Sequence, residues 1–365
     1  MRAALLTEYQ APLVVADDVD IERPGAGEVK VRITHCGVCH SDLSAVDGVF
    51  PLPLPVILGH EAAGVVDAVG PGVRAVAPGD KVVLAANPPC GRCPSCARGE
   101  WGTCVRVNDL FSASLGDGTT RLSRDGAVVY RGLGVGAFGE YVITPETGAV
   151  KVADDTPLDV ACVIGCAVQT GVGSVLNTAR VEEGSTVLVI GLGGVGMSVV
   201  QGARLAGAAR IIVSDPIAER REVARGLGAT DAIDPTATEV PVAVHGLVDG
   251  GVDYAFEVVG RSALVRDCIW STRSGGTTVM VGAMGLDDPL VIEPAVVFAS
   301  TERKLLGTLL GSSNSLREVP RLLGLWRAGR LDLEALITMR RPIAEVNEAF
   351  ADLRAGRGIR TVLSF

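Results

Sequence analysis

The chain has 365 residues, of which 48% are apolar and 21% are charged, a balance typical of a globular protein. This length exceeds what one hydrophobic core usually supports, so two domains are expected. The formal net charge of −9 and the lack of a basic run argue against nucleic acid or an anionic membrane as a partner.

Short β-type segments separated by Gly and Pro dominate the chain up to about residue 150. Such spacing predicts an irregular, mainly β domain. No signal peptide or membrane span is recognisable, and nine cysteines in such a chain favour a reducing compartment, so the expected location is the cytoplasm. The strands expected here are 28–35, 62–69, 80–85 and 139–143.

Strands alternate with helices from about residue 170, which predicts a parallel sheet. The expected strands are 187–190, 210–214, 252–257 and 277–282, with helices at 195–206 and 218–226. Two more helices at 316–328 and 343–355 and a final strand at 360–365 complete the chain.

Four cysteines follow a Cys-x2-Cys-x2-Cys-x7-Cys spacing in a loop rich in Gly, Pro, Ser and Arg. One short loop with this spacing can surround a tetrahedral zinc ion and leave no open position for a substrate, so a structural zinc is predicted. An iron–sulfur cluster also uses four thiolates, but the bacterial motif ends in Cys-x3-Cys-Pro, which the seven-residue gap does not match. The four are Cys90, Cys93, Cys96 and Cys104.

A GLGGVG motif follows the apolar segment VLVI and opens a predicted helix, as a dinucleotide pyrophosphate site requires. Asp215 ends the next strand, where its carboxylate is placed to accept from the adenosine ribose and to repel a 2′-phosphate. NAD is therefore favoured over NADP. The motif residues are Gly191, Gly193, Gly194, Val195 and Gly196.

Cys39, His60 and Cys166 are candidate ligands of a second, catalytic zinc with an open fourth position. Their wide separation makes the spacing alone a weak signal. The residues by themselves leave open a buried core histidine and core cysteines.

Several motifs together resemble the zinc-dependent medium-chain alcohol dehydrogenases, particularly the long branch with two zinc sites. The motifs are GVCHSD, GHEAAG, the four-cysteine segment, IGC, GLGGVG and GIRTVLSF, and they span essentially the whole chain. The resemblance implies an α/β protein with a GroES-like, mainly β catalytic domain and a doubly wound Rossmann domain. The implied boundaries are 1–167 and 310–365 for the catalytic domain, with a zinc lobe at about 88–106, and 168–309 for the Rossmann domain.

The same resemblance implies roles for individual residues. Cys39, His60 and Cys166 become the catalytic zinc ligands, with Asp42 orienting His60 and Glu61 behind the metal. Ser41 accepts the alcohol proton. Cofactor contacts fall on His40 and Arg360 at the pyrophosphate, Arg220 at the ribose, and Thr170 and Val195 at the nicotinamide.

The activity implied is oxidation of a primary alcohol to an aldehyde with NAD, in a homodimer that pairs through the strand near residues 304–311. Two positions depart from the pattern of the alcohol dehydrogenases. Ser44 replaces a histidine that ends the proton relay, so the proton is expected to leave through solvent. Ala86 replaces a large aromatic residue, which predicts room for a bulky aromatic or terpenoid alcohol.

Two alternatives stay open at this point. A thiol-adduct formaldehyde dehydrogenase belongs to the same branch, although Asn108 stands where those enzymes carry an arginine. A non-catalytic, dinucleotide-binding member is the remote alternative, and retention of the candidate zinc ligands argues against it.

Overall fold

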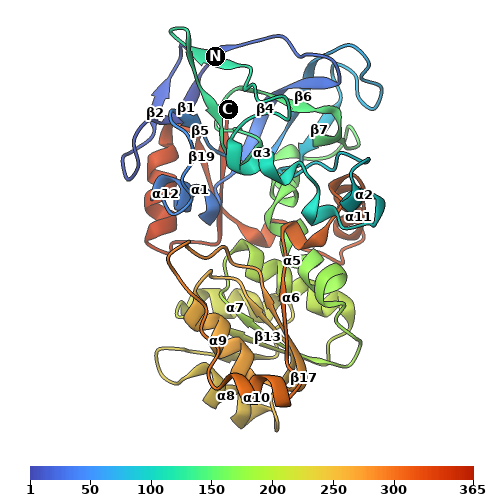
Figure 1. Ribbon diagram of the computed structural model, residues 1–365, viewed down its shortest axis with the longest axis vertical. Coiled ribbons are helices and arrows are strands. Elements are labelled where there is room, and N and C mark those ends of the chain that lie inside the picture. Colours follow the sequence, from blue (N-terminus) through green and yellow to red (C-terminus); the bar gives the residue numbers. More distant parts are fainter. The chain divides into compact units, whose positions relative to one another are not determined.

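The computed structural model describes residues 1–365, which form two compact units. Unit 1 contains Met1–Ala167, Asn314–Gly329 and Leu333–Phe365. Unit 2 contains Val168–Ser313 and Arg330–Asp332. The colours of Figure 1 follow this path, since blue and red segments share unit 1 while yellow and orange segments form unit 2.

The main sheet of unit 1 has seven strands in the order β12-β7-β6-β4-β20-β19, and β11 also pairs with β4. Alternate residues of β4 face the core: Val29, Val31 and Ile33 are at most 1% exposed. The last strand, β20, pairs antiparallel with β4, so the C-terminal segment completes this sheet. The strands are β4 (Glu28–Gly37), β6 (Glu61–Val69), β7 (Lys81–Leu84), β11 (Tyr141–Pro145), β12 (Ala149–Lys151), β19 (Ile337–Pro342) and β20 (Arg360–Ser364).

Two smaller sheets and several short helices complete unit 1. A four-stranded sheet has the order β10-β5-β1-β2, and a three-stranded sheet has the order β3-β8-β9. Their strands are β1 (Ala3–Leu6), β2 (Val14–Ala16), β3 (Asp20–Ile21), β5 (Val56–Ile57), β8 (Leu122–Arg124), β9 (Ala127–Val128) and β10 (Tyr130–Arg131). The helices are α1 (His40–Val46), α2 (Pro94–Ala97), α3 (Val107–Ser112), α4 (Leu158–Ala161), α11 (Ser315–Arg327) and α12 (Val346–Arg354).

Unit 2 is built on six parallel strands in the order β15-β14-β13-β16-β17-β18. In chain order this is 3-2-1-4-5-6, the Rossmann arrangement. Val187, Leu188 and Val189 of β13 are all fully buried, as expected of a central strand covered on both faces. The strands are β13 (Thr186–Ile190), β14 (Arg210–Ser214), β15 (Asp231–Ile233), β16 (Val252–Glu257), β17 (Thr272–Met280) and β18 (Lys304–Gly307).

Helices flank this sheet (Figure 1). Most expected elements end within two residues of those observed, but β17 begins at Thr272 and not at residue 277. Its first half contains two glycines, Gly275, with φ +75°, and Gly276. Glycine is depleted in strand interiors, so this part of the strand was not predicted from the sequence. The helices are α5 (Ala167–Gly173), a π-helix (Ser174–Ala179), α6 (Gly194–Ala206), α7 (Ala218–Leu227), α8 (Val240–Leu247), α9 (Ser262–Ser271) and α10 (Ala295–Ser300).

The beginning and the end of the long segment of unit 2 are joined by hydrogen bonds. Asn177 Nδ2 donates to the Gly311 carbonyl at 3.3 Å and to Ser313 Oγ at 3.1 Å. The hydroxyl of Thr178 lies 2.9 Å from those of Thr308 and Ser312. The unit therefore starts and finishes at neighbouring points.

No single helix is long and apolar enough to cross a membrane. One bent pair of helices, Leu158–Gly165 and Ala167–Ala179, together has the length and the apolar composition of a membrane span.

Candidate functional site

The four cysteines of the lobe converge in unit 1. Their sulfur atoms all lie within 4.8 Å of one another, with Cys93–Cys104 at 3.9 Å and Cys90–Cys96 at 4.0 Å. A disulfide needs about 2.05 Å, whereas four thiolates around zinc at about 2.3 Å stand about 3.8 Å apart. The arrangement thus fits a tetrahedral zinc ion and not two disulfides.

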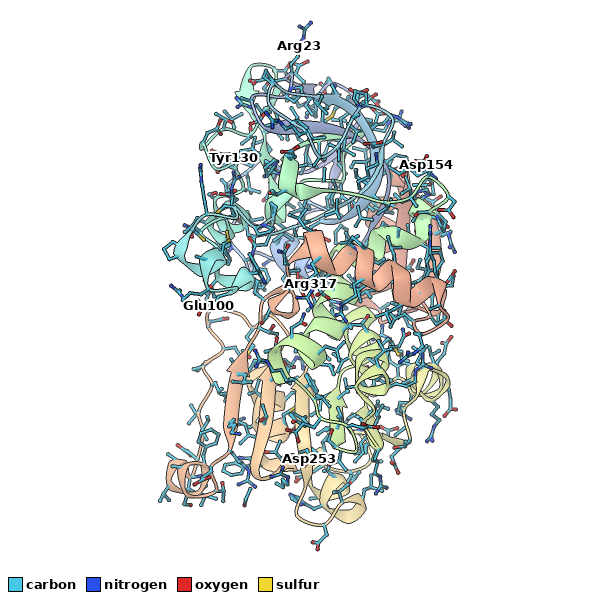
Figure 2. All side chains as sticks on the ribbon, turned by 90° about the vertical axis from the view of Figure 1, so that its right-hand side faces the viewer. Arg23, Glu100, Tyr130, Asp154, Asp253 and Arg317 are labelled. Atoms are coloured by element: carbon cyan, nitrogen blue, oxygen red, sulfur yellow. The ribbon has the colours of Figure 1, made fainter.

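Local backbone geometry holds these thiols. Cys93 caps α2, where Pro94 occupies the first turn, and its sulfur accepts from the Cys96 N–H at 3.4 Å. The N–H groups of Cys96 and Val105 lower the pKa of Cys93 to about 6, which favours the thiolate that a metal requires. Figure 2 labels Glu100, which lies in this loop between the third and fourth cysteines.

Cys93→Ser is expected to lower the melting temperature by at least about 5 °C and to remove one zinc ion per chain, because a structural zinc site contributes folding energy directly. Differential scanning calorimetry and elemental analysis measure the two effects. Ser95→Ala, in the same short helix but outside the cluster, is the control and should change neither. A Cys93→Ser protein with normal thermal stability but altered substrate preference would contradict a structural role.

A second cluster in unit 1 brings together Cys39, His60, Glu61 and Cys166, all buried, with ligand atoms within 4.8 Å of one another. Cys39 lies at the N-cap of α1, and His60 directly precedes β6. Cys166 lies between a 3-10 turn (Cys162–Gly165) and α5. Cys39, His60 and Cys166, whose spacing in the sequence was only a weak signal of a common site, are therefore neighbours in the fold.

Asp42, fully buried on α1, organises this cluster. Its Oδ2 accepts from the Cys39 N–H at 3.1 Å, and its Oδ1 accepts from the Gly59 N–H at 2.9 Å and lies 3.1 Å from His60 Nδ1. A carboxylate at Nδ1 fixes the proton there and leaves Nε2 as the lone-pair nitrogen. Such a carboxylate–histidine pair is typical of zinc sites.

Glu61 and Arg360 form a buried ion pair beside these ligands. Arg360 Nε lies 3.4 Å from Glu61 Oε2, Arg360 Nη1 donates to the Val38 carbonyl at 2.7 Å, and Glu61 Oε1 accepts from the Ala167 N–H at 3.2 Å. Burial raises the pKa of Glu61 to about 7, despite the opposing charge of Arg360. Glu61 Oε2 accepts no hydrogen bond, so within the structure its charge is balanced only by the ion pair with Arg360.

The remaining unit 1 candidates flank Cys39. Ser41 Oγ lies 3.8 Å from Cys39 Sγ, close to the cluster. His40, the first residue of α1, is exposed.

The glycine motif of unit 2 forms a tight turn between β13 and α6. Gly191 has φ +98°, a conformation that favours glycine. A Cβ on Gly196 would lie 1.8 Å from the Gly191 carbonyl oxygen, so no side chain fits there. A Cβ on Gly193 would meet nothing within 4 Å. The turn is closed on its inner side and open at Gly193, as a cradle for a pyrophosphate group requires.

Asp215 follows β14 and is held against this turn. Its Oδ2 accepts from the Leu192 N–H and its Oδ1 from the Ile217 N–H, both at 2.8 Å. Arg220 Nη1 lies 4.0 Å from Asp215 Oδ2. Each carboxylate oxygen has a second lone pair, so Asp215 retains the capacity to accept from ribose hydroxyls.

Among the other unit 2 candidates, Thr170 in α5 is 8% exposed, and its hydroxyl has no hydrogen-bond partner. Val195, in the first turn of α6, is partly buried. Gly194 is buried in the same turn.

Sequence reasoning missed Arg221, which donates to the Asp215 carbonyl at 2.6 Å and to Asp234 at 3.0 Å, next to the Arg220 that it singled out. It also passed over Glu257, a fully buried acidic residue at the end of β16.

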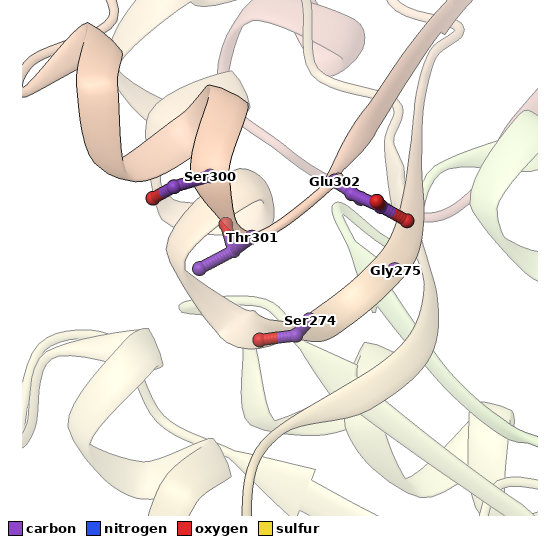
Figure 3. A pocket seen from close by; sticks show the side chains of 5 residues that line it. All are labelled: Ser274, Gly275, Ser300, Thr301 and Glu302. Atoms are coloured by element: carbon purple, nitrogen blue, oxygen red, sulfur yellow. The ribbon is translucent and has the colours of Figure 1, made fainter.

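A shallow pocket of about 290 Å³ lies elsewhere in unit 2, between the start of β17 and the end of α10 (Figure 3). No residue of either cluster or of the glycine turn lines it; the lining residues are Ser274, Gly275, Ser300, Thr301 and Glu302.

Comparisons with known proteins agree with this architecture. Residues 25–154 match the alcohol dehydrogenase GroES-like domain, and residues 194–324 match the zinc-binding dehydrogenase domain. An alcohol dehydrogenase zinc-binding domain protein from Burkholderia ambifaria is 36% identical, with a TM-score of 0.94, over 100% of this chain and 98% of that chain.

Two further solved structures are similar along their whole length. Benzyl alcohol dehydrogenase from Acinetobacter calcoaceticus is 29% identical with a TM-score of 0.93, over 100% of this chain and 99% of that chain. A zinc-binding dehydrogenase from Sinorhizobium meliloti 1021, bound to NADP, is 28% identical with a TM-score of 0.82, over 100% and 99%.

The fold and its two sites therefore define a zinc-binding dehydrogenase, an oxidoreductase with GroES-like and Rossmann-type domains. Within that class, the chain belongs to the zinc-dependent medium-chain alcohol dehydrogenase family.

Proposed function

We propose that this protein binds two zinc ions per chain and oxidises a primary alcohol to the aldehyde with NAD. The observation that carries the proposal is the convergence of Cys39, His60 and Cys166 around a buried point, with Asp42 fixing the His60 tautomer. Three protein ligands leave a tetrahedral ion one position for a substrate.

The donor set fits zinc, because two thiolates and an imidazole are ligands that it prefers. When bound, zinc supplies a Lewis acid for an alcohol oxygen, and a nicotinamide dinucleotide supplies the hydride acceptor. A hydrogen bond from Cys166 lowers the pKa of Cys39 well below its usual range, against the effect of burial, which favours the thiolate form that a metal requires.

The chain's own groups take the remaining roles. Ser41 Oγ receives the alcohol proton and passes it toward solvent, since Ser44 offers no base. We assign the dinucleotide to the Gly191–Gly196 turn of unit 2, with Thr170 and Val195 at the nicotinamide and Arg220 at the ribose.

NAD is proposed over NADP because the Asp215 carboxylate would repel a 2′-phosphate. Because the relative from Sinorhizobium meliloti is bound to NADP, both dinucleotides have to be compared in any test of the proposed function.

A bulky aromatic alcohol is the proposed substrate class. Ala86 provides less volume than the aromatic residue typical of the family at this position. The similarity to a benzyl alcohol dehydrogenase supports the same choice.

A substrate panel tests these points: ethanol, benzyl alcohol and a terpenoid alcohol, each with NAD and NADP, and formaldehyde with and without added glutathione. We expect benzyl alcohol to give a higher kcat/KM than ethanol, NAD to exceed NADP by at least about tenfold, and no requirement for thiol. A preference for ethanol would contradict the wide pocket, and thiol-dependent activity would point to the thiol-adduct enzymes. No turnover with any pair would favour a non-catalytic member.

A homodimer is also proposed. Strand β18 is the edge of the unit 2 sheet, so its outer backbone groups are unpaired within the chain. Exposed apolar side chains accompany it in the preceding segment, with Leu286 86% and Val296 72% exposed. Analytical ultracentrifugation tests the assembly, and a monomer at micromolar concentration would contradict it.

A further inference from the structure

Glu257 is the last residue of β16, and the role inferred for it below rests on the proposed use of a nicotinamide dinucleotide. Glu257 is completely buried and has no ion-pair partner. A buried carboxylate is costly unless hydrogen bonds compensate it, so its retention at this point requires an explanation.

The carboxylate is bound by the turn that follows it. Glu257 Oε1 accepts from the N–H groups of Val259 at 2.8 Å, Gly260 at 2.7 Å and Arg261 at 3.4 Å. Burial raises the pKa of Glu257, while these N–H groups oppose that shift. One side chain thus fixes the backbone of three consecutive residues.

This turn touches the glycine motif directly. A Cβ on Gly191 would lie 2.5 Å from Val259 Cγ2, and a Cβ on Gly196 would lie 3.3 Å from Val258 Cγ2. The two valines therefore press against the first and last glycines of the proposed pyrophosphate turn. Val259 is 47% exposed, unusual for a large apolar side chain in such a position.

The other side of the turn is equally constrained. A Cβ on Gly282 would lie 2.1 Å from the Gly260 nitrogen and 2.8 Å from Glu257 Oε2, and a Cβ on Gly260 would lie 2.5 Å from the Ala283 carbonyl. Val281 and Gly282 also donate to the Glu257 carbonyl, both at 2.9 Å. The 258–261 turn is held between two loops, and Glu257 anchors it from within.

We propose that Glu257 is a positioning residue of the dinucleotide site: its carboxylate shapes the 258–261 turn, and that turn keeps the glycine motif in the conformation that binds the cofactor. The role depends on the reach of the side chain and on its acceptor oxygen, not on its charge. Glu257→Gln, which keeps both length and acceptor, is therefore expected to bind NAD with a Kd within about threefold of the wild type. Glu257→Asp and Glu257→Ala are expected to raise the Kd by at least about tenfold, since the turn loses its anchor.

Asp253 provides the matched control, because it lies in the same strand near its opposite end, where Figure 2 labels it. Its Oδ2 accepts from the Thr186 N–H and hydroxyl, both at 2.8 Å, so Asp253→Ala also removes a carboxylate that holds a backbone N–H, here a partly buried one that is paired with Arg273 as well. A merely structural carboxylate lowers the melting temperature without changing cofactor affinity, and this is the expected behaviour of Asp253→Ala.

The experiment measures the Kd for NAD and NADP by quenching of intrinsic fluorescence, together with melting temperature and zinc content, at a temperature at which every variant is folded. The proposal is upheld if Glu257→Asp binds NAD at least tenfold more weakly than Glu257→Gln and Asp253→Ala, with zinc content unchanged. It is overturned if Glu257→Asp binds like the wild type, or if Glu257→Gln loses affinity as much as Glu257→Asp. Failure of the wild type to bind either dinucleotide would overturn the proposed function itself.

Discussion

Cys166→Ser is expected to reduce the zinc content from two ions to one per chain and to lower kcat/KM for benzyl alcohol by more than about 100-fold. Loss of a residue that only supports a metal ligand typically lowers metal affinity or activity about 10-fold to 100-fold. Loss of a ligand itself is therefore expected to lower activity further. The thiol lies within 4.8 Å of the ligand atoms of Cys39 and His60, and serine is a much weaker zinc ligand. Elemental analysis and steady-state kinetics measure the two changes.

Cys162→Ser is the matched control, four residues earlier in the same segment. Cys162 is fully buried and Cys166 is 8% exposed, and the Cys162 sulfur contacts the Asp159 carbonyl at 3.4 Å outside the cluster. This variant should keep two zinc ions and most of its activity, although burial of a hydroxyl will lower its stability. Two zinc ions in Cys166→Ser, or one in Cys162→Ser, would show that the ligand assignment is wrong.

Gly193→Val is expected to weaken dinucleotide binding by at least about 100-fold while leaving the melting temperature close to that of the wild type. Gly193 has φ −75°, which any residue adopts, and a side chain there meets no protein atom within 4 Å. The space is open in the protein alone and would be filled by the cofactor. Gly196→Val, in contrast, is expected to lower the melting temperature, because its side chain collides with the Gly191 carbonyl and destabilises the fold.

Gly226→Val is the control for the Gly193 experiment. Gly226 lies in α7 of the same unit and likewise has no atom within 4 Å of a built Cβ. It should leave the Kd for NAD unchanged, as measured by isothermal titration calorimetry. A Gly193→Val protein that binds NAD normally would exclude this turn as the pyrophosphate site.

The sequence predicted the Rossmann unit well because its signals are local. Strands such as 210–214 and 252–257 are short β-type segments with a mainly apolar centre, and both were predicted with their observed ends. The four-cysteine lobe was predictable for the same reason, since all its ligands lie within one short loop.

The mainly β unit and the second cluster were harder to predict. The position of β20 beside β4 depends on pairing across most of the chain length, which periodicity does not contain. Only the resemblance to a family identified the second set of zinc ligands, Cys39, His60 and Cys166. They lie far apart in the sequence, and tertiary structure brings them together. Glu257 escaped notice because a single acidic residue at a strand end is indistinguishable from an ordinary turn residue until its burial is known.

The hydrogen bonds that join Asn177 and Thr178 to residues 308–313 have a consequence for the history of the chain. A folded domain whose two ends lie close together can be inserted into another domain without distorting it. Cofactor binding and metal chemistry would then have been separable modules. Their combination in one polypeptide would allow the proposed cofactor preference at Asp215 to change while the proposed alcohol pocket at Ala86 is kept, and the reverse.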